Sequence, residues 1–240
     1  VTAAIVREDG ADKIELEEAY IESLDGASLV NNTFFKLGRA FWNVAALNPQ
    51  HSHADDFADR PLPYRVFLNK AYNDDGFEAS YLLGSSEIGF GLFRGEDFPF
   101  GNVAANEGEG SQAWSIYYKS NFNMSNTEEI AFNLYHLSGE SPEFNERVST
   151  EDNVSFEGDS DLSVVSIDYL NSYGSDSKLK FSAEYFYRNQ DGIFEDAEES
   201  TGKVSFDDSD SGYYIALVNQ FNDHLSAGFR YSEMLAADTP

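Results

Sequence analysis

The stretch Leu179-Lys180-Phe181-Ser182-Ala183-Glu184-Tyr185-Phe186-Tyr187-Arg188 alternates between two kinds of side chain. Its odd-numbered positions are apolar and end in two tyrosines, whereas most of its even-numbered positions are polar. Successive side chains of a β-strand point to opposite faces of a sheet, so this pattern predicts a strand with one apolar and one polar face. A tilted strand of about ten residues is also long enough to cross a lipid bilayer.

The same alternation recurs along the chain and predicts about ten strands. Clear segments lie at 129–134, 164–169 and 225–232, and weaker ones at Lys13–Leu24, Thr33–Trp42, Gly76–Leu83, Ile88–Arg94, Gln112–Phe122 and Tyr213–Gln220. In Lys13–Leu24 the alternation slips between Leu16 and Ala19, which a β-bulge would explain.

Short connections between these segments alternate with long ones. The long ones are Asn43–Asp75, Gly95–Ser111, Ser138–Asp161 and Asn189–Gly212. Outer-membrane barrels pair short periplasmic turns with long extracellular loops in this way. We therefore predict an all-β fold, an antiparallel up-and-down transmembrane β-barrel, with the long loops at one end of the sheet.

Composition excludes several other classes of protein. No stretch reaches the roughly 20 apolar residues of a membrane-spanning helix. The net charge of -28 disfavours nucleic acid as a partner, and 20 Phe with 14 Tyr are too many aromatics for a disordered acidic chain. The absence of cysteine excludes zinc fingers and thiol nucleophiles. No pattern supports catalysis, so we expect neither an enzyme nor catalytic residues, and no cofactor is firmly indicated.

The two ends of the chain suggest a partial barrel. Val1–Asp12 contains no export signal, and residues 236–240 do not form the terminal aromatic strand of a complete barrel. We expect residues 1–240 to form a single barrel domain that lacks strands at one or both ends.

The first long loop carries the strongest candidate for a binding site. It contains His51 and His53, followed by Asp55, Asp56 and Asp59. Imidazole and carboxylate ligands suit a divalent transition metal such as zinc, and two histidines one residue apart project to the same side of an extended segment. The alternative is a polar loop whose aspartates pair with Arg60 and Arg65. In a barrel this loop is expected to fold inward and narrow the pore, with these five residues at the channel mouth.

This loop and the strand before it resemble a bacterial porin-like family, the zinc-regulated outer-membrane proteins. The likeness rests on Lys36-Leu37-Gly38-Arg39-Ala40-Phe41 and on the loop from Leu47 to Pro61, and it extends from about Ile14 to Pro99. The family has a K-x-G-R-F strand leading into L-N-x-Q-H-x-H-x-x-D-F-x-D-x-P, and this chain departs from it at Ala40. The resemblance implies an outer-membrane protein of a Gram-negative bacterium, made under zinc limitation, with a pore or receptor role.

The polar faces of the strands carry cations that would line the lumen of a barrel. They are Lys36, Lys119, Lys180, Arg188 and Arg230. The simplest interpretation is that they solvate the channel and pair with acidic lumen residues; the alternative is an electrostatic ladder for anions.

Three functions from different classes are consistent with these observations. The first is an outer-membrane, porin-like channel for small solutes or metal ions, surrounded by lipid and compatible with a homo-oligomer. The second is an energy-coupled, TonB-type metal receptor barrel, which needs a plug domain. The third is a soluble β-sandwich binding module.

Overall fold

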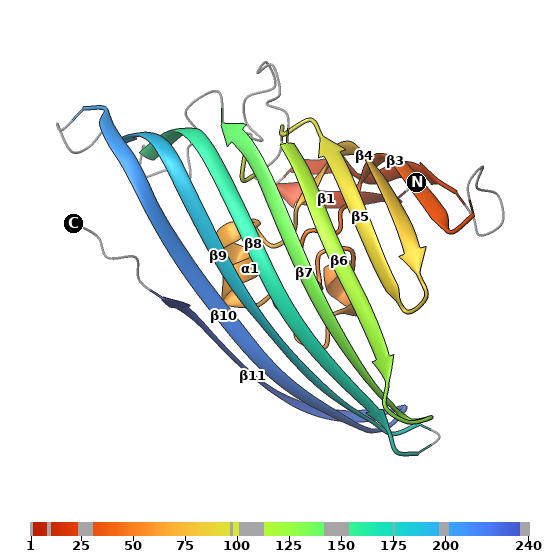
Figure 1. Ribbon diagram of the computed structural model, residues 1–240. Coiled ribbons are helices and arrows are strands. Elements are labelled where there is room, and N and C mark those ends of the chain that lie inside the picture. Colours follow the sequence, from red (N-terminus) through yellow and green to blue (C-terminus); the bar gives the residue numbers. More distant parts are fainter. Residues whose placement is uncertain are drawn as a thin grey trace.

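The computed structural model describes residues 2–8, 11–23, 31–96, 98–100, 113–141, 154–174, 176–196 and 202–235. Over these ranges the chain forms one antiparallel sheet of eleven strands, whose order follows the sequence (Figure 1). The strands are β1 (Thr2–Glu8), β2 (Ala11–Glu22), β3 (Thr33–Phe41), β4 (Asn73–Leu83), β5 (Ser86–Phe93), β6 (Ala113–Asn123), β7 (Glu128–Ser141), β8 (Val154–Ser172), β9 (Lys178–Asp196), β10 (Val204–Asn222) and β11 (Leu225–Leu235).

The sheet is curved and open. Figure 1 shows strands β5 to β11 as a curved wall, with the helix α1 (Leu62–Phe67) and the chain around it on the hollow side. Within the described residues β1 and β11 pair only with β2 and β10, so the sheet does not close on itself. The predicted class, an all-β, up-and-down, partial barrel, is therefore confirmed. No helix in the described ranges is long and apolar enough to cross a membrane.

The ends of the sheet differ as predicted. Because every neighbouring pair is antiparallel, the connections 42–72, 94–112, 142–153 and 197–203 all leave the same end. The turns after β6, β8 and β10 lie together at the other end, at the lower right of Figure 1. Two connections do not fit this division: only two residues separate β1 from β2 at the long-loop end, and ten separate β2 from β3 at the turn end, most of them outside the described residues.

Several strand bounds differ from the sequence prediction. Strands β8, β9 and β10 have 19 residues each and extend into the predicted loops, so Asp207, Asp208 and Asp210 lie in β10. Polar residues occupy both faces there, which removes the alternation while backbone pairing continues. The bulge is confirmed in β2, because Thr2 pairs with Glu18 and Ala3 with Leu16, which leaves Glu17 without an opposing residue.

The convex face is apolar and exposed. Leu134 pairs with Val165, which pairs with Tyr185, and in the next row Phe132 pairs with Ile167. All five of these side chains are exposed, as are Leu217 and Phe229 on β10 and β11. The apolar side chains that share this face are Ile130, Phe132, Leu134, Val165, Ile167, Leu179, Phe181, Leu217 and Phe229.

The buried core lies on the other, concave face. Tyr117, Tyr135, Leu137, Val164 and Phe186 project from neighbouring strands and are at most 5% exposed. They pack against residues of the segment between β3 and β4, which provides the second layer of the core.

Candidate functional site

The connection between β3 and β4, residues 42–72, packs on the concave face of the sheet and is here called the inner loop. Its side chains Trp42, Tyr64, Phe67, Leu68 and Tyr72 are 0% exposed. The ring of Phe186 on β9 lies 5.0 Å from the Tyr64 ring and 6.0 Å from the Phe67 ring, centroid to centroid. Burying large apolar side chains stabilises the docked loop by about 1.5–3 kcal/mol for each.

Two buried polar side chains hold the inner loop in shape. Asn48 donates to the carbonyl oxygens of Trp42 and Tyr72 at 2.8 and 2.9 Å, and accepts the Tyr72 amide at 2.7 Å. Arg60 donates to the carbonyl oxygens of Leu47 and Gln50 at 2.7 and 2.6 Å. Asn48 thereby joins the two ends of the loop, and Arg60 closes its middle part.

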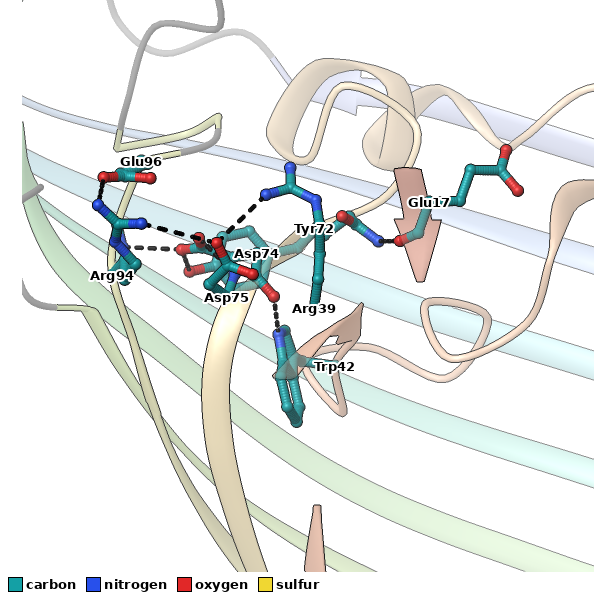
Figure 2. A network of polar contacts seen from close by, with 10 residues as sticks. Glu17, Arg39, Trp42, Tyr72, Asp74, Asp75, Arg94 and Glu96 are labelled. Atoms are coloured by element: carbon teal, nitrogen blue, oxygen red, sulfur yellow. Dashed lines mark hydrogen bonds and ion pairs between the residues drawn. The ribbon is translucent and has the colours of Figure 1, made fainter. Parts of the chain in front are cut away.

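The end of the inner loop is fixed by a polar network around Asp74 (Figure 2). The Asp74 carboxylate is fully buried and accepts the Tyr72 hydroxyl at 3.0 Å and the amides of Asp75 and Gly95, both at 2.7 Å. The Trp42 indole N–H donates to the Asp74 carbonyl oxygen at 2.8 Å. A buried carboxylate with three donors is well satisfied, so this network ties Trp42 and Tyr72 to the start of β4.

On the opposite side of β4, Asp75 lies between two arginines. Arg39 and Arg94 each place a guanidinium nitrogen 3.7 Å from the same Asp75 oxygen, and Arg94 also contacts Glu96, as Figure 2 shows. These groups link β3, β4 and the end of β5 next to the buried Asp74.

Two glutamates on the strands receive backbone amides of the inner loop. Glu78 on β4 accepts the Asn43 side-chain amide at 2.6 Å and its backbone amide at 3.3 Å. Glu184 on β9 accepts the Ala46 amide at 2.8 Å. The start of the loop is thus bonded to both sides of the curved sheet.

All five cations predicted to line the lumen lie on the concave face and contact the inner loop. Lys119 donates to Asn43, Lys180 to Asp56 at 3.1 Å, and Arg230 to Asp59 at 2.7 Å. The Arg188 guanidinium lies 4.9 Å from the centre of the Phe67 ring, and the Lys36 ammonium 5.4 Å from that of Trp42. They share the concave face and each contacts the inner loop, while the Lys180 side chain also remains 44% exposed.

The five candidate metal ligands are not brought together. Asp55 pairs with Arg60 at 2.6 Å, Asp56 with Lys180, and Asp59 with Arg230. Among the residues the structure describes, no group of three or more His, Asp or Glu side chains is arranged to hold a metal ion. The metal site predicted from His51, His53, Asp55, Asp56 and Asp59 is therefore not assembled, because each aspartate faces a different cation.

His51 and His53 form a pair of their own. Their rings are stacked with centroids 5.4 Å apart, and His51 Nε2 lies 2.8 Å from a Glu18 carboxylate oxygen. Glu17, the bulged residue of β2, lies 3.9 Å from His51 Nδ1. The bulge thus brings two consecutive glutamates to one histidine at the edge of the inner loop.

The environment of the loop aspartates shifts their acidity in opposite directions. Burial raises the pKa of Asp55, although the neighbouring Arg60 opposes this shift. The hydrogen bond from Arg230 lowers the pKa of Asp59. Asp59 therefore stays a carboxylate to a lower pH than an ordinary aspartate, whereas Asp55 takes up a proton more readily.

Sequence reasoning predicted only some of the residues that organise the inner loop. Arg60 was predicted as a partner of the loop aspartates, which its pair with Asp55 confirms, whereas the role of Asn48 in the same motif was not predicted. Glu78 and Glu184 are acidic residues at inward positions of strands, and such positions alternate with apolar ones. Each of these acids stands at a strand position whose side chain points inward, and this could have been recognised in the sequence. A buried carboxylate requires hydrogen-bond donors nearby, so the position predicts a polar partner.

Comparison with known proteins gives a distant similarity. The chain is 25% identical over 249 residues to an uncharacterized protein of Aquifex aeolicus (strain VF5), covering 94% of this chain and 48% of the relative. The chain thus spans about half the length of the curated relative that it matches. No family model matches the chain, and no solved structure matches it significantly.

Proposed function

We propose that the protein forms part of an outer-membrane β-barrel channel for small solutes, with the inner loop folded into its lumen as a constriction. One observation carries the proposal. The convex face of the sheet is apolar and exposed, whereas the concave face combines charged side chains such as Lys119 and Glu184 with an aromatic core, and a loop of the same chain covers it. Lipid outside and a polar lumen inside require this division of faces.

The polarity of the convex face along the strands supports a membrane boundary. Rows such as Leu134–Val165–Tyr185 are apolar, whereas Asp159 and Asp191 pair on the same face nearer the long-loop end. Asp207 on β10 pairs with Asp191 and continues that acidic row. The apolar rows suit the hydrocarbon layer and the carboxylates suit the aqueous side, which is extracellular in this proposal.

The concave face retains space beside the inner loop. Two hollows of about 480 and 540 Å³ both include Leu82 and Glu87 in their walls. They are otherwise lined mainly by polar side chains, among them Lys36, Asn43, Lys119 and Asp168. A constriction with solvated space on one side suits the passage of small hydrophilic solutes.

The other functions gain less support. A soluble sandwich needs a second sheet over the convex face, and within the described residues that face is exposed. A metal receptor and the link to zinc acquisition rest on the motif resemblance alone.

The channel function is tested by reconstituting the intact protein in planar lipid bilayers. Discrete conductance steps and heat-modifiable migration in detergent gels are expected. A protein that stays soluble without detergent and gives no conductance would overturn the proposal.

A further inference from the structure

The two hollows beside the inner loop share Leu82 and Glu87 in their walls and are here together called the vestibule. Their volumes are about 480 and 540 Å³. The walls come from the turn-end parts of strands β2 to β8, and Asn43 and Ala46 of the inner loop complete them. Since a water molecule takes up about 30 Å³ in the liquid, the larger hollow alone has room for a hydrated ion.

Carboxylates outnumber cations in the walls of the vestibule. Among the described residues that line it, two are lysines and five carry carboxylates: Lys36 and Lys119 against Glu22, Glu78, Glu87, Glu129 and Asp168. The walls therefore carry a formal excess of three negative charges at neutral pH. A hollow lined mainly by one sign of charge within low-dielectric walls concentrates ions of the opposite sign.

Both lysines are held against the walls. The Lys119 ammonium donates to Asn43 and lies 4.8 Å from the centre of the Tyr117 ring. The Lys36 ammonium lies 4.2 Å from the centre of the Tyr20 ring. Each lysine thus rests on an aromatic face, which attracts cations. The carboxylates consequently determine the sign of the field in the open part of the vestibule.

The opposite side of the concave face does not balance this charge. Three cations of strands β9 and β11 each have an aspartate of their own: Lys180 pairs with Asp56, Arg188 with Asp210 and Arg230 with Asp59. Within each pair the charges cancel. The electrostatic ladder for anions, an alternative suggested by the sequence, therefore gains no support from these three residues.

Asp168 is well placed to act on a solute in the larger hollow. It lines that hollow from β8, and its direct cross-strand neighbour on β7 is Ala131, which lines the same hollow. Asp168 accepts a hydrogen bond from the Ser182 side chain. Because a hydroxyl is neutral, this bond leaves the negative charge of Asp168 in place.

We propose that the vestibule attracts small hydrated cations and repels anions, with Asp168 as a residue that determines this specificity. The hollow is wide enough to leave water around the ion, so the carboxylates act through their field and not as direct ligands. Salt screens such a field, since the Debye length is about 10 Å at 0.1 M and about 3 Å at 1 M. The inference rests on the proposed function in one respect, that the vestibule lies on the route of the solutes.

The test measures the electrostatic potential beside Asp168 with a chemical probe. Ala131→Cys places a thiol there, and the chain has no cysteine of its own. The intact protein in detergent is treated with a cationic and an anionic methanethiosulfonate reagent of similar size, and the two reaction rates are compared. Their ratio cancels any change in the reactivity of the thiol itself. Relative to a small thiol in solution, we expect the ratio to favour the cationic reagent at least about fivefold at low salt.

Asp168→Asn in the Ala131→Cys protein keeps the shape of the side chain and removes its charge. Directly opposite side chains have Cβ atoms about 5 Å apart, so the rate ratio should fall by about three- to tenfold. Asp159→Asn is the matched control, because it removes the same charge from the same strand. Asp159 lies on the convex face, about 30 Å away along β8, and its replacement should leave the ratio unchanged. In 1 M salt the ratio should approach that of the small thiol.

Equal ratios with and without Asp168→Asn would overturn the proposal, as would a preference for the anionic reagent or a ratio that salt does not alter. If Asp168→Asn does not fold, Glu129→Gln removes another charge from the same hollow, and its result is judged in the same way. Conductance is measured separately. A ratio that responds to Asp168 without any conductance refutes the channel alone, whereas conductance with a ratio that ignores Asp168 refutes the cation-attracting vestibule alone.

Discussion

Replacing Arg60 with Met tests whether the inner loop depends on its buried polar scaffold. Arg60 bonds two loop carbonyl oxygens and pairs with Asp55, and its side chain is 2% exposed. Removing the guanidinium leaves the Asp55 carboxylate buried without a counter-charge, which costs about 3–5 kcal/mol. The docked loop should lose stability by that amount, while the strands around it remain paired.

Hydrogen exchange of two amides reports this loss directly. The Leu47 amide donates to the Tyr64 hydroxyl and the Tyr72 amide to Asn48, both at 2.7 Å. Since about 1.4 kcal/mol corresponds to a factor of ten, their exchange should accelerate between roughly a hundredfold and several-thousandfold.

Arg65→Met is the matched control, because the Arg65 side chain is 54% exposed and lies 3.9 Å from Asp59. An exposed pair of that kind contributes about 0–1 kcal/mol. Replacing Asp55 and Arg60 together with Leu and Met should cost less than Arg60→Met alone, since no buried charge is left unpaired. Equal exchange rates in Arg60→Met and Arg65→Met would refute the reasoning.

Three further predictions concern the strand cations, pH and the convex face. Replacing Lys180 and Arg230 together with Ala removes two ion pairs worth about 0–1 kcal/mol each, so the inner loop should stay docked while single-channel current noise increases. Unchanged noise would argue that these two ion pairs do not restrain the loop. The lowered pKa of Asp59 means that its contact with Arg230 stabilises the docked loop above pH 3.8 and is lost as the pH falls through the folded value. Pepsin cleavage within residues 55–59 should therefore increase below that pH, and Asp59→Asn should remove this part of the dependence. Phe132→Arg places a cation in the apolar band and should cost about 2–4 kcal/mol of folding free energy in lipid, whereas Asp159→Arg, in the acidic row, should cost close to zero; equal costs would mean that lipid does not cover this face.

Local pattern predicted the sheet because strand alternation is a property of neighbouring residues. The rows around Leu134, Val165 and Tyr185 follow from period two alone, and so does the slip that became the bulge at Glu17. The ends of β8 to β10 were misread as loops, since acids on both faces erase the alternation without ending the backbone pairing. Strand β1 was missed for a similar reason, because Ala3, Ala4, Ile5 and Val6 do not alternate.

The partners of the inner loop were beyond the reach of local pattern. Asp56 meets Lys180 across 124 residues, and Asp59 meets Arg230 across 171. The spacing of the motif suggested that its histidines and aspartates bind one metal ion together. In the structure Asp55 instead pairs with Arg60 of the same loop, and Asp56 and Asp59 each pair with a strand cation far along the chain. The curvature of the sheet, which brings β9 and β11 over the loop, decides these contacts.

The central claim, lipid on the convex face and a polar lumen on the concave face, is tested most directly by spin labels. The chain has no cysteine, so single cysteines can be placed at will. Labels at 134 and 165 on the convex face should collide with oxygen dissolved in the lipid, and labels at 121 and 131, which line the larger hollow on the concave face, should not. Equal accessibility of all four positions to a water-soluble nickel chelate would contradict the account.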